Sequence, residues 1–169
     1  MRRNIYKGRV VDLNVETVTL PNGATVELEI IHHPGAVAIV PMTPTGSVLL
    51  IRQYRHAAGG YIYEVPAGKL DPGEAPQVCA ARELEEEIGR RASSFEPLMS
   101  FFTTPGFTDE VIHVFLATGL APGTQHLDQD EVLEIVEMPL DMAIARIADG
   151  TIRDAKTIIG LQTVFLRRK

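Results

Sequence analysis

The pattern of apolar positions divides the chain into a β-rich amino-terminal stretch and a longer mixed segment. Short alternating runs surround the turn-forming Pro21-Asn22-Gly23 and predict a small antiparallel meander. Its expected strands are Lys7–Leu13, Thr17–Leu20 and Thr25–Ile31. His32-His33-Pro34-Gly35 then breaks the pattern, so we expect a β arm over residues 1–33 and a separate domain over residues 34–169.

Unbroken apolar runs in the second segment predict strands that are buried on both faces. Ala36–Pro41 and Ser47–Gln53 are two such runs, joined by a tight turn at Pro44-Thr45-Gly46. Further strands are expected over Tyr61–Val65, Phe95–Thr103, Val111–Leu120 and Val132–Met138, and helices over Ala75–Ile88, Leu140–Asp149 and Ala155–Leu166. This order predicts the α+β class, an α/β sandwich rather than a regular doubly wound βαβ sheet.

The helix expected over Ala75–Ile88 combines an apolar stripe with an acidic face, and Gly89 provides its stop signal. The stripe consists of Ala80, Leu84 and Ile88. Glu83, Glu86 and Glu87 are spaced i, i+3 and i+4, so their three carboxylates share one face and repel one another. A hard cation such as Mg²⁺, which prefers oxygen ligands, would turn this repulsion into a binding site. For such a run taken alone, a solvated acidic face is the alternative.

Composition and charge restrict the classes of partner. The 169 residues include 16 Lys and Arg against 22 Asp and Glu, a formal net charge of −6. Such a chain repels polyanions, so we expect no bulk binding to nucleic acid or to a membrane. The single cysteine, Cys79, excludes a disulfide framework and is expected to be a core residue. Since we also find no apolar run long enough for a signal peptide or a membrane span, we expect a cytoplasmic protein.

The acidic face lies within the pattern Gly68-x5-Glu74-x7-Arg82-Glu83-Leu84-x-Glu86-Glu87-x-Gly89. This pattern resembles the signature of the Nudix hydrolases, Gx5Ex7REUxEExGU, in which U is a bulky aliphatic residue. All seven fixed positions match, as does the first aliphatic position at Leu84, and only the last aliphatic position differs, because Arg90 occupies it. The resemblance implies the Nudix fold, an α/β/α sandwich with a mixed central sheet, and hydrolysis of a nucleoside diphosphate linked to another group.

Sequence outside this signature is similar to the ADP-ribose pyrophosphatase branch of the family. Arg52-Gln53-Tyr54-Arg55, followed by Tyr63-Glu64-Val65-Pro66-Ala67-Gly68, resembles the RQYR…ELPAG stretch of that branch. Thr104-Pro105-Gly106-Phe107, with Glu110 shortly after it, resembles a proline-containing loop of the same enzymes. The resemblance implies hydrolysis of ADP-ribose to AMP and ribose 5-phosphate, with other nucleoside diphosphate sugars as further substrates. It also implies a homodimer that exchanges the amino-terminal arm.

The resemblance further implies a metal site and a general base. The ligands for Mg²⁺, with Mn²⁺ as the alternative ion, are Glu83, Glu86 and Glu87 together with the backbone carbonyl of Ala67. Glu86 is also a catalytic candidate. The expected base is Glu131, with Asp130 as the second choice, in the acidic loop before the strand at Val132–Met138. An ordinary polar loop is the competing interpretation of that segment.

Substrate contacts and structural positions complete the expected site. The substrate contacts are Arg55, which we expect at the diphosphate, together with Glu64, Glu110 and Phe107. Phe107 is read as either a core residue or part of the base pocket. The structural positions are Gly68, Glu74, Arg82 and Gly89. The planar fork of Arg82 can pair with the Glu74 carboxylate, and Gly68 allows a sharp turn from strand into loop.

Two other functions stay open. The first is a Nudix hydrolase for a different compound, such as GDP-mannose, ADP-glucose or a diadenosine polyphosphate. The second is a non-catalytic domain that senses ADP-ribose. Such sensors usually carry a degraded signature and a fused DNA-binding domain, whereas this chain has an intact signature.

Overall fold

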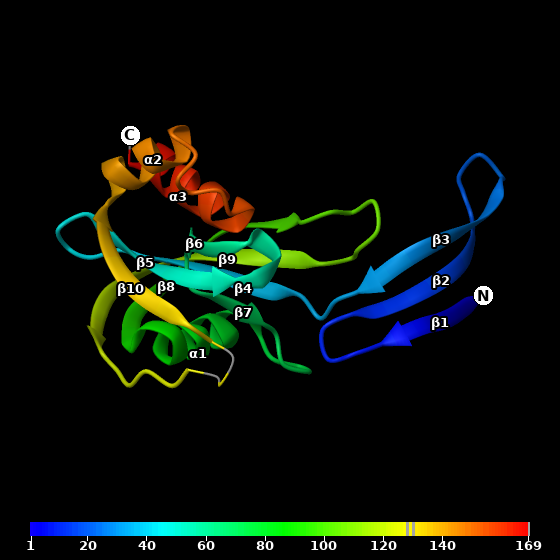
Figure 1. Ribbon diagram of the computed structural model, residues 1–169, viewed down its shortest axis with the longest axis horizontal. Coiled ribbons are helices and arrows are strands. Elements are labelled where there is room, and N and C mark those ends of the chain that lie inside the picture. The colour runs from blue at the N-terminus through cyan, green and yellow to red at the C-terminus, as the bar shows by residue number, and fades with distance from the viewer. Residues whose placement is uncertain (128, 130, 169) are drawn as a thin grey trace.

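The protein consists of a layered body and a three-stranded arm that projects from it, as the computed structural model in Figure 1 shows. The structure describes residues 1–127, 129 and 131–168. Within this part of the chain, we find no helix whose length and apolar character would suit a membrane span.

The arm is an antiparallel sheet of β1 (Arg2–Lys7), β2 (Asp12–Thr19) and β3 (Thr25–His32). The expected meander is therefore present, but the strand predicted over Lys7–Leu13 is wrong. The chain turns there, with the Gly8 amide donating to the Val11 carbonyl at 2.8 Å. Val10 and Val11 are adjacent apolar residues, so the alternation of a half-buried strand does not hold at this point.

Two sheets form the centre of the body. One has the order β10-β5-β6 and the other β7-β4-β9-β8. The strands are β4 (Ala36–Pro41), β5 (Ser47–Arg55), β6 (Gly60–Glu64), β7 (Ala67–Lys69), β8 (Arg90–Phe102), β9 (Val111–Pro122) and β10 (Leu133–Pro139). β4 and β9 run parallel and the other neighbours antiparallel, which gives the mixed arrangement that the family resemblance implied.

Helices cover both faces of these sheets, so the body is an α/β/α sandwich (Figure 1). α1 (Pro76–Ile88) packs on one face, and α2 (Leu140–Ala148) and α3 (Ala155–Arg167) pack on the other. The continuous apolar run of β4 serves both layers. Val37 and Ile39 contact the α1 side, whereas Ala38 and Val40 contact the α2 and α3 side.

Most element predictions agree with the structure, and the differences have local causes. β4 and β5 are buried as expected, but they belong to different sheets and share only an isolated bridge, Met42 with Val48, in the described part of the chain. β7 was not predicted, because a three-residue strand shows no periodicity. β8 begins at Arg90 rather than Phe95, since its polar first residues pair with the end of β9.

Candidate active site

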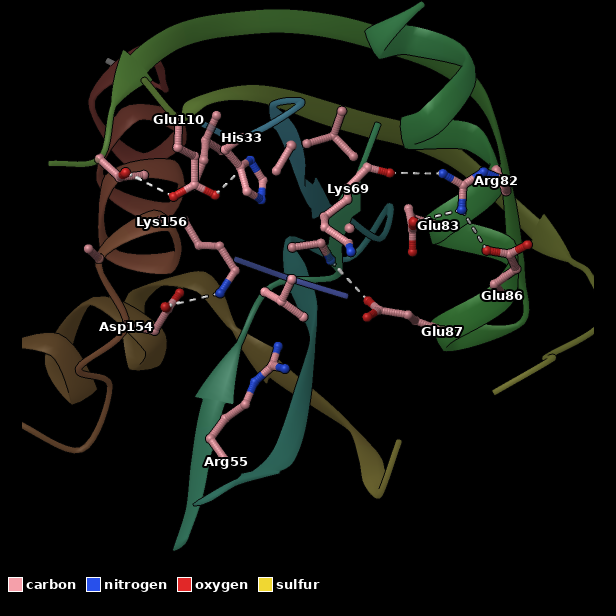
Figure 2. Close-up of a pocket in the computed structure, with 18 of the residues that line it drawn as sticks. His33, Arg55, Lys69, Arg82, Glu83, Glu86, Glu87, Glu110, Asp154 and Lys156 are labelled. Atoms are coloured by element: carbon pink, nitrogen blue, oxygen red, sulfur yellow. Dashed lines mark hydrogen bonds and ion pairs between the residues drawn. The ribbon is translucent and has the colours of Figure 1, made fainter. Parts of the chain in front are cut away.

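A cleft of about 1080 Å³ opens between α1, α3 and the ends of β5 and β7, a volume that suits a nucleotide-sized ligand. The sequence-predicted residues along its walls are Arg55, Ala67, Gly68, Arg82, Glu83, Glu86, Glu87, Glu110 and Glu131. Figure 2 shows the acidic residues of α1 on one side and Asp154 and Lys156 on the other, with Arg55 reaching up from β5. These residues therefore lie at one place, although they come from distant parts of the chain, whereas Glu64 and Phe107 are not among the described lining residues.

The ends of α1 fix the position of its acidic face, which we define as Glu83, Glu86 and Glu87. Pro76 stands in the first turn, where its missing amide hydrogen costs nothing. At the other end Gly89 adopts a left-handed conformation with φ 59°, and its amide donates to the Glu85 carbonyl. The apolar stripe of the helix packs into the core, so the acidic face is directed to the cleft.

Glu87 is the most deeply buried member of the acidic face, with 2% of its surface exposed. Burial raises the pKa of its carboxyl to about 8, and the charges of Glu83 and Glu131 add to this increase. The Ala67 amide opposes the increase by donating to Glu87 Oε2 at 2.9 Å. The pKa of Glu83 is also raised, chiefly by burial, while Arg82 opposes that change.

The donor chemistry of this face fits a hard divalent cation. Glu83 and Glu87, whose pKa values are raised by burial, are stabilised in their charged form by a nearby positive charge, and carboxylate oxygens are the ligands that Mg²⁺ prefers. Among the described residues, no three His, Cys, Asp or Glu side chains already stand together at ligand spacing. Arg82 instead holds Glu83 and Glu86, and the Ala67 amide holds Glu87.

Arg82 links the loop before α1 to the helix, as its expected pairing with Glu74 requires. Its Nε and Nη2 donate to the two carboxylate oxygens of Glu74 at 3.0 and 2.9 Å. Its Nη1 donates to Glu83 at 2.7 Å and to Glu86 at 3.0 Å. The guanidinium holds the pKa of Glu74 down at about 2, so this link is intact throughout the neutral range.

Gly68 is needed for a reason other than the sharp turn expected from the sequence. It lies within β7, and its φ is not in the left-handed region. A Cβ at this position would overlap the carboxylate of Glu83. The glycine therefore makes room for a side chain of the acidic face. Cys79 is fully buried in the core as expected, and burial raises the pKa of its thiol to about 12.

Opposite the acidic face lies a network that we call the Arg55 cluster: Arg55, Glu64, Asp154 and Lys156. Arg55 donates through Nε and Nη2 to the two oxygens of Glu64 at 2.8 and 2.9 Å. Lys156 Nζ lies 2.7 Å from Glu64 Oε2 and 3.0 Å from Asp154 Oδ1. Burial alone would raise the pKa of Glu64, but the two cations outweigh it and the pKa is lowered.

The loop that contains Phe107 joins the body to the arm. Glu110 reaches the cleft, where it accepts a hydrogen bond from Thr103 at 2.8 Å and lies 3.5 Å from His33. Phe107 is half exposed, so it is not a core residue. It is also not among the described residues that line the cleft. Its carbonyl accepts from the Ile31 amide at 2.8 Å, which ties this loop to β3.

The segment that leads to Glu131 is fastened across the carboxyl end of α1. The Gln125 side chain donates to the Glu87 carbonyl at 2.7 Å, and the His126 amide donates to the Glu86 carbonyl at 2.9 Å. Glu131 lines the same cleft as the acidic face, close enough for its charge to raise the pKa of Glu83 and Glu87. Asp130, the second candidate for the base, lies outside the described residues.

Several cleft residues were not singled out from the sequence. Lys69, Asp154 and Lys156 line the cleft, and so does His33, for which a structural role was the default (Figure 2). One local signal was available: Asp154 immediately precedes the expected last helix and caps it by accepting from the Thr157 amide at 3.0 Å. The signal locates the start of α3 but does not indicate that this end faces the cleft.

Comparisons with known proteins agree with this geometry. A methanol dehydrogenase activator from Bacillus methanolicus is 46% identical over 96% of this chain and 89% of its own length. An ADP-ribose pyrophosphatase from Bacillus subtilis strain 168 is 42% identical over 98% of this chain and 91% of its own length.

The fold has a close structural counterpart as well. A crystal structure of an ADP compounds hydrolase matches 99% of this chain and 91% of its own, with a TM-score of 0.87 and 25% identity. The family model described as NUDIX domain matches residues 32–159, which include every member of the acidic face and of the Arg55 cluster. The chain therefore belongs to the Nudix family of hydrolases.

Proposed function

We propose that this protein hydrolyses the diphosphate bond of nucleoside diphosphate sugars, with ADP-ribose preferred and AMP and ribose 5-phosphate as products. The main support is that the three carboxylates of the Nudix signature lie across one cleft from Arg55 and Lys156. A substrate diphosphate is anionic, and such a site offers both cationic side chains and ligands for a neutralising metal. The ADP-ribose pyrophosphatase relative supports the choice of substrate.

Nudix hydrolases generally need a divalent metal. We assign Glu83, Glu86 and Glu87, with the Ala67 carbonyl, as the ligands here, and Mg²⁺ as the ion, with Mn²⁺ as a substitute. When bound, the ion supplies charge neutralisation at the diphosphate and makes attacking water more acidic. Arg82 and Gly68 act on the ligands: Arg82 keeps Glu83 and Glu86 oriented, and Gly68 leaves the space that the Glu83 carboxylate fills.

Side chains of the chain itself bind the substrate and move the proton. Arg55 contacts the diphosphate, while Glu64, being buried, acts on the substrate through its bonds to Arg55 and Lys156. Glu110, which lines the cleft, is assigned to the diphosphate or the distal ribose of the substrate, and Phe107 to its base. Glu131, which lines the cleft beside the acidic face, accepts the proton of the attacking water. A Glu131→Gln variant is expected to lose most of its turnover, and unchanged turnover would remove Glu131 from this role.

The substrate is tested with a panel of compounds and Mg²⁺: ADP-ribose, ADP-glucose, GDP-mannose and a diadenosine polyphosphate. Release of the nucleoside monophosphate should be fastest from ADP-ribose, which gives AMP, and should stop on addition of a chelator. If GDP-mannose is hydrolysed fastest, the proposed substrate is wrong but the proposed reaction, hydrolysis of the diphosphate bond, still holds. Binding of ADP-ribose without hydrolysis of any compound would favour a sensing domain.

The arm over residues 1–33 is assigned to homodimer formation by exchange between two copies, with the catalytic domain over residues 34–169. β1 is exposed along its whole length, and Ile5, Tyr6 and Val10 are 46%, 59% and 57% exposed. A small isolated sheet with such apolar exposure is stabilised when it packs on a second surface. Sedimentation at micromolar concentration should give a dimer for the full chain, and a monomer would contradict the assignment.

We further propose a cytoplasmic location. The only cysteine is a buried thiol in the core, which suits a reducing compartment. Fractionation of cells that produce the protein should place it with cytoplasmic markers.

A second candidate function follows from the 46% identical relative, whose name is methanol dehydrogenase activator. On this proposal the chain stimulates an alcohol dehydrogenase. The test adds the purified protein to a methanol dehydrogenase and measures the rate of alcohol oxidation. Stimulation that a Glu87→Gln variant also gives would separate this activity from hydrolysis.

A further inference from the structure

The amino end of α3 brings a second cation into the cleft, beside Arg55. Lys156 is only 15% exposed at its side chain, and it lines the cleft with Ala155 and Asp154. Its ammonium group bonds to Glu64 at 2.7 Å, the same carboxylate that holds Arg55 through two hydrogen bonds. Lys156 therefore acts on the position and charge of the residue assigned to the diphosphate.

The location of Lys156 is rigidly determined. Asp154 caps α3 by accepting from the Thr157 amide at 3.0 Å and from the Thr157 hydroxyl at 2.6 Å. The fully buried Thr157 hydroxyl in turn accepts from the Val65 amide at 2.8 Å. Because Val65 follows Glu64 and Thr157 follows Lys156, this hydrogen bond fastens the start of α3 to the end of β6 next to the Glu64–Lys156 pair.

Lys156 balances the charge of the Arg55 cluster. Two cations, Arg55 and Lys156, face two carboxylates, Glu64 and Asp154, so the cluster is neutral as a whole. Without Lys156 the cluster would carry one net negative charge at the wall that faces the acidic face of α1. A diphosphate entering the cleft would then meet excess negative charge on both sides.

We propose that Lys156 is a positioning residue for diphosphate recognition, which shares Glu64 with Arg55 and offsets the charge of Asp154. This inference rests on the proposed hydrolysis of nucleoside diphosphate compounds. Lys156 keeps the cluster neutral, so Arg55 stays available to an anionic substrate instead of serving as the only counter-ion of two carboxylates. The role concerns binding of the substrate more than the chemical step.

The test compares Lys156→Met, Lys156→Arg and the double variant Asp154→Asn with Lys156→Met. Lys156→Met should raise KM on the order of tenfold, with kcat changed much less, because a partly buried unit charge near the diphosphate is lost. Lys156→Arg should keep KM close to the wild-type value. The double variant restores neutrality, and Asn caps a helix about as well as Asp, so most of the increase in KM should disappear.

Arg146→Met is the matched control, because Arg146 forms a comparable ion pair with Asp149 at 3.0 Å on the exposed side of α2. It should leave KM and kcat unchanged. The Nε–H resonance of Arg55 provides a readout that does not depend on turnover. It should shift in Lys156→Met and return toward its wild-type position in the double variant.

The outcomes separate this inference from the proposed function. Failure of the wild-type protein to hydrolyse any compound of the panel contradicts the function itself. Activity in the wild type with an unchanged KM in Lys156→Met overturns only the inference. So does an increase in KM that the double variant does not reverse, since that result indicates a purely structural role. Thermal unfolding of each variant shows whether its fold is retained.

Discussion

The two sides of the cleft are built in opposite ways. The acidic face comes from a single turn of α1, so its three carboxylates are neighbours in sequence as well as in space. The Arg55 cluster takes its members from β5, the end of β6 and the start of α3, which are far apart in the chain. The acidic face thus follows from the spacing of residues along one helix, whereas the Arg55 cluster forms only when β5, β6 and α3 come together in the fold.

This contrast predicts different responses to mutation. A change in the acidic face should affect activity with little effect on stability, because the helix beneath it is held by its own apolar stripe. A change in the Arg55 cluster should affect both, because the same hydrogen bonds join α3 to β6. Substitutions on the two sides of the cleft should therefore separate activity from stability.

Glu87→Gln should lower kcat at least about 100-fold, since even partners of metal ligands typically contribute 10–100-fold. Its stability should not fall, because glutamine cannot ionise at a position where burial disfavours the charged carboxylate, and its amide oxygen can still accept from the Ala67 amide. Turnover of ADP-ribose and thermal unfolding are the measurements. Glu137→Gln, an exposed position on β10, is the control and should behave like the wild type. Severe unfolding of Glu87→Gln would contradict the expectation that the acidic face affects activity without affecting stability.

Gly68→Ala should weaken metal binding by about tenfold or more, because the added methyl would displace the Glu83 carboxylate. Calorimetric titration with Mg²⁺ measures this effect directly. Gly106→Ala introduces the same methyl into open space in a loop and should leave metal affinity unchanged. Equal affinities for the two variants would show that Glu83 does not need the space at Gly68.

Thr157→Val should destabilise the protein by about 1–3 kcal/mol, because the buried Val65 amide loses its acceptor. Urea unfolding gives the free energy, and an accompanying increase in KM is expected. Thr163→Val in the same helix is the control. Its hydroxyl donates back to the Ile159 carbonyl at 2.7 Å and makes a long contact of 4.0 Å with the Met99 sulfur, so a change within about 0.5 kcal/mol is expected. Similar losses of unfolding free energy in both variants would show that the hydrogen bond between Val65 and Thr157 contributes no particular stability.

The smallest effect is expected at another contact between distant elements, His32 of the arm with Asp109 of the body. His32 lies 2.6 Å from Asp109 and 2.8 Å from Glu16, and the hydrogen bonds that these carboxylates accept from its ring raise the pKa of His32. A raised folded-state pKa means that the stabilisation is complete below about pH 6.5 and is lost as the pH rises through the folded value. The hydrogen bond with His32 also keeps the pKa of Asp109 low, against burial, so acid removes the contact only below about pH 4.

His32→Gln should therefore lower stability by roughly 0.5–1 kcal/mol at pH 5 to 6, a typical value for a partly exposed ion pair. The difference from the wild type should shrink as the pH rises to 9. Thermal unfolding as a function of pH measures both curves. A difference that is constant across this range would show that the charge of His32 does not contribute.

Much of the body could be predicted because its signals are local. The buried runs of β4 and β5 and the stripe of α1 each appear within a dozen residues, so the elements and the layered class follow from them. The turn between β1 and β2 was missed because Val10 and Val11 are strand-favouring residues and continue the apolar run through the turn. β7 was missed because its pairing with β4, and not its own pattern, makes it a strand.

For the site, the acidic face, the Arg82–Glu74 link and the family of the chain could be predicted from the sequence, since spacing along one helix fixes which side chains share a face. The place of Lys156 and Asp154 in the cleft, and the room that Gly68 makes for Glu83, emerged only from the fold. The same is true of the two cations that Glu64 binds. Such contacts depend on how close the ends of separate elements come in space. The spacing of residues along the chain does not give that distance.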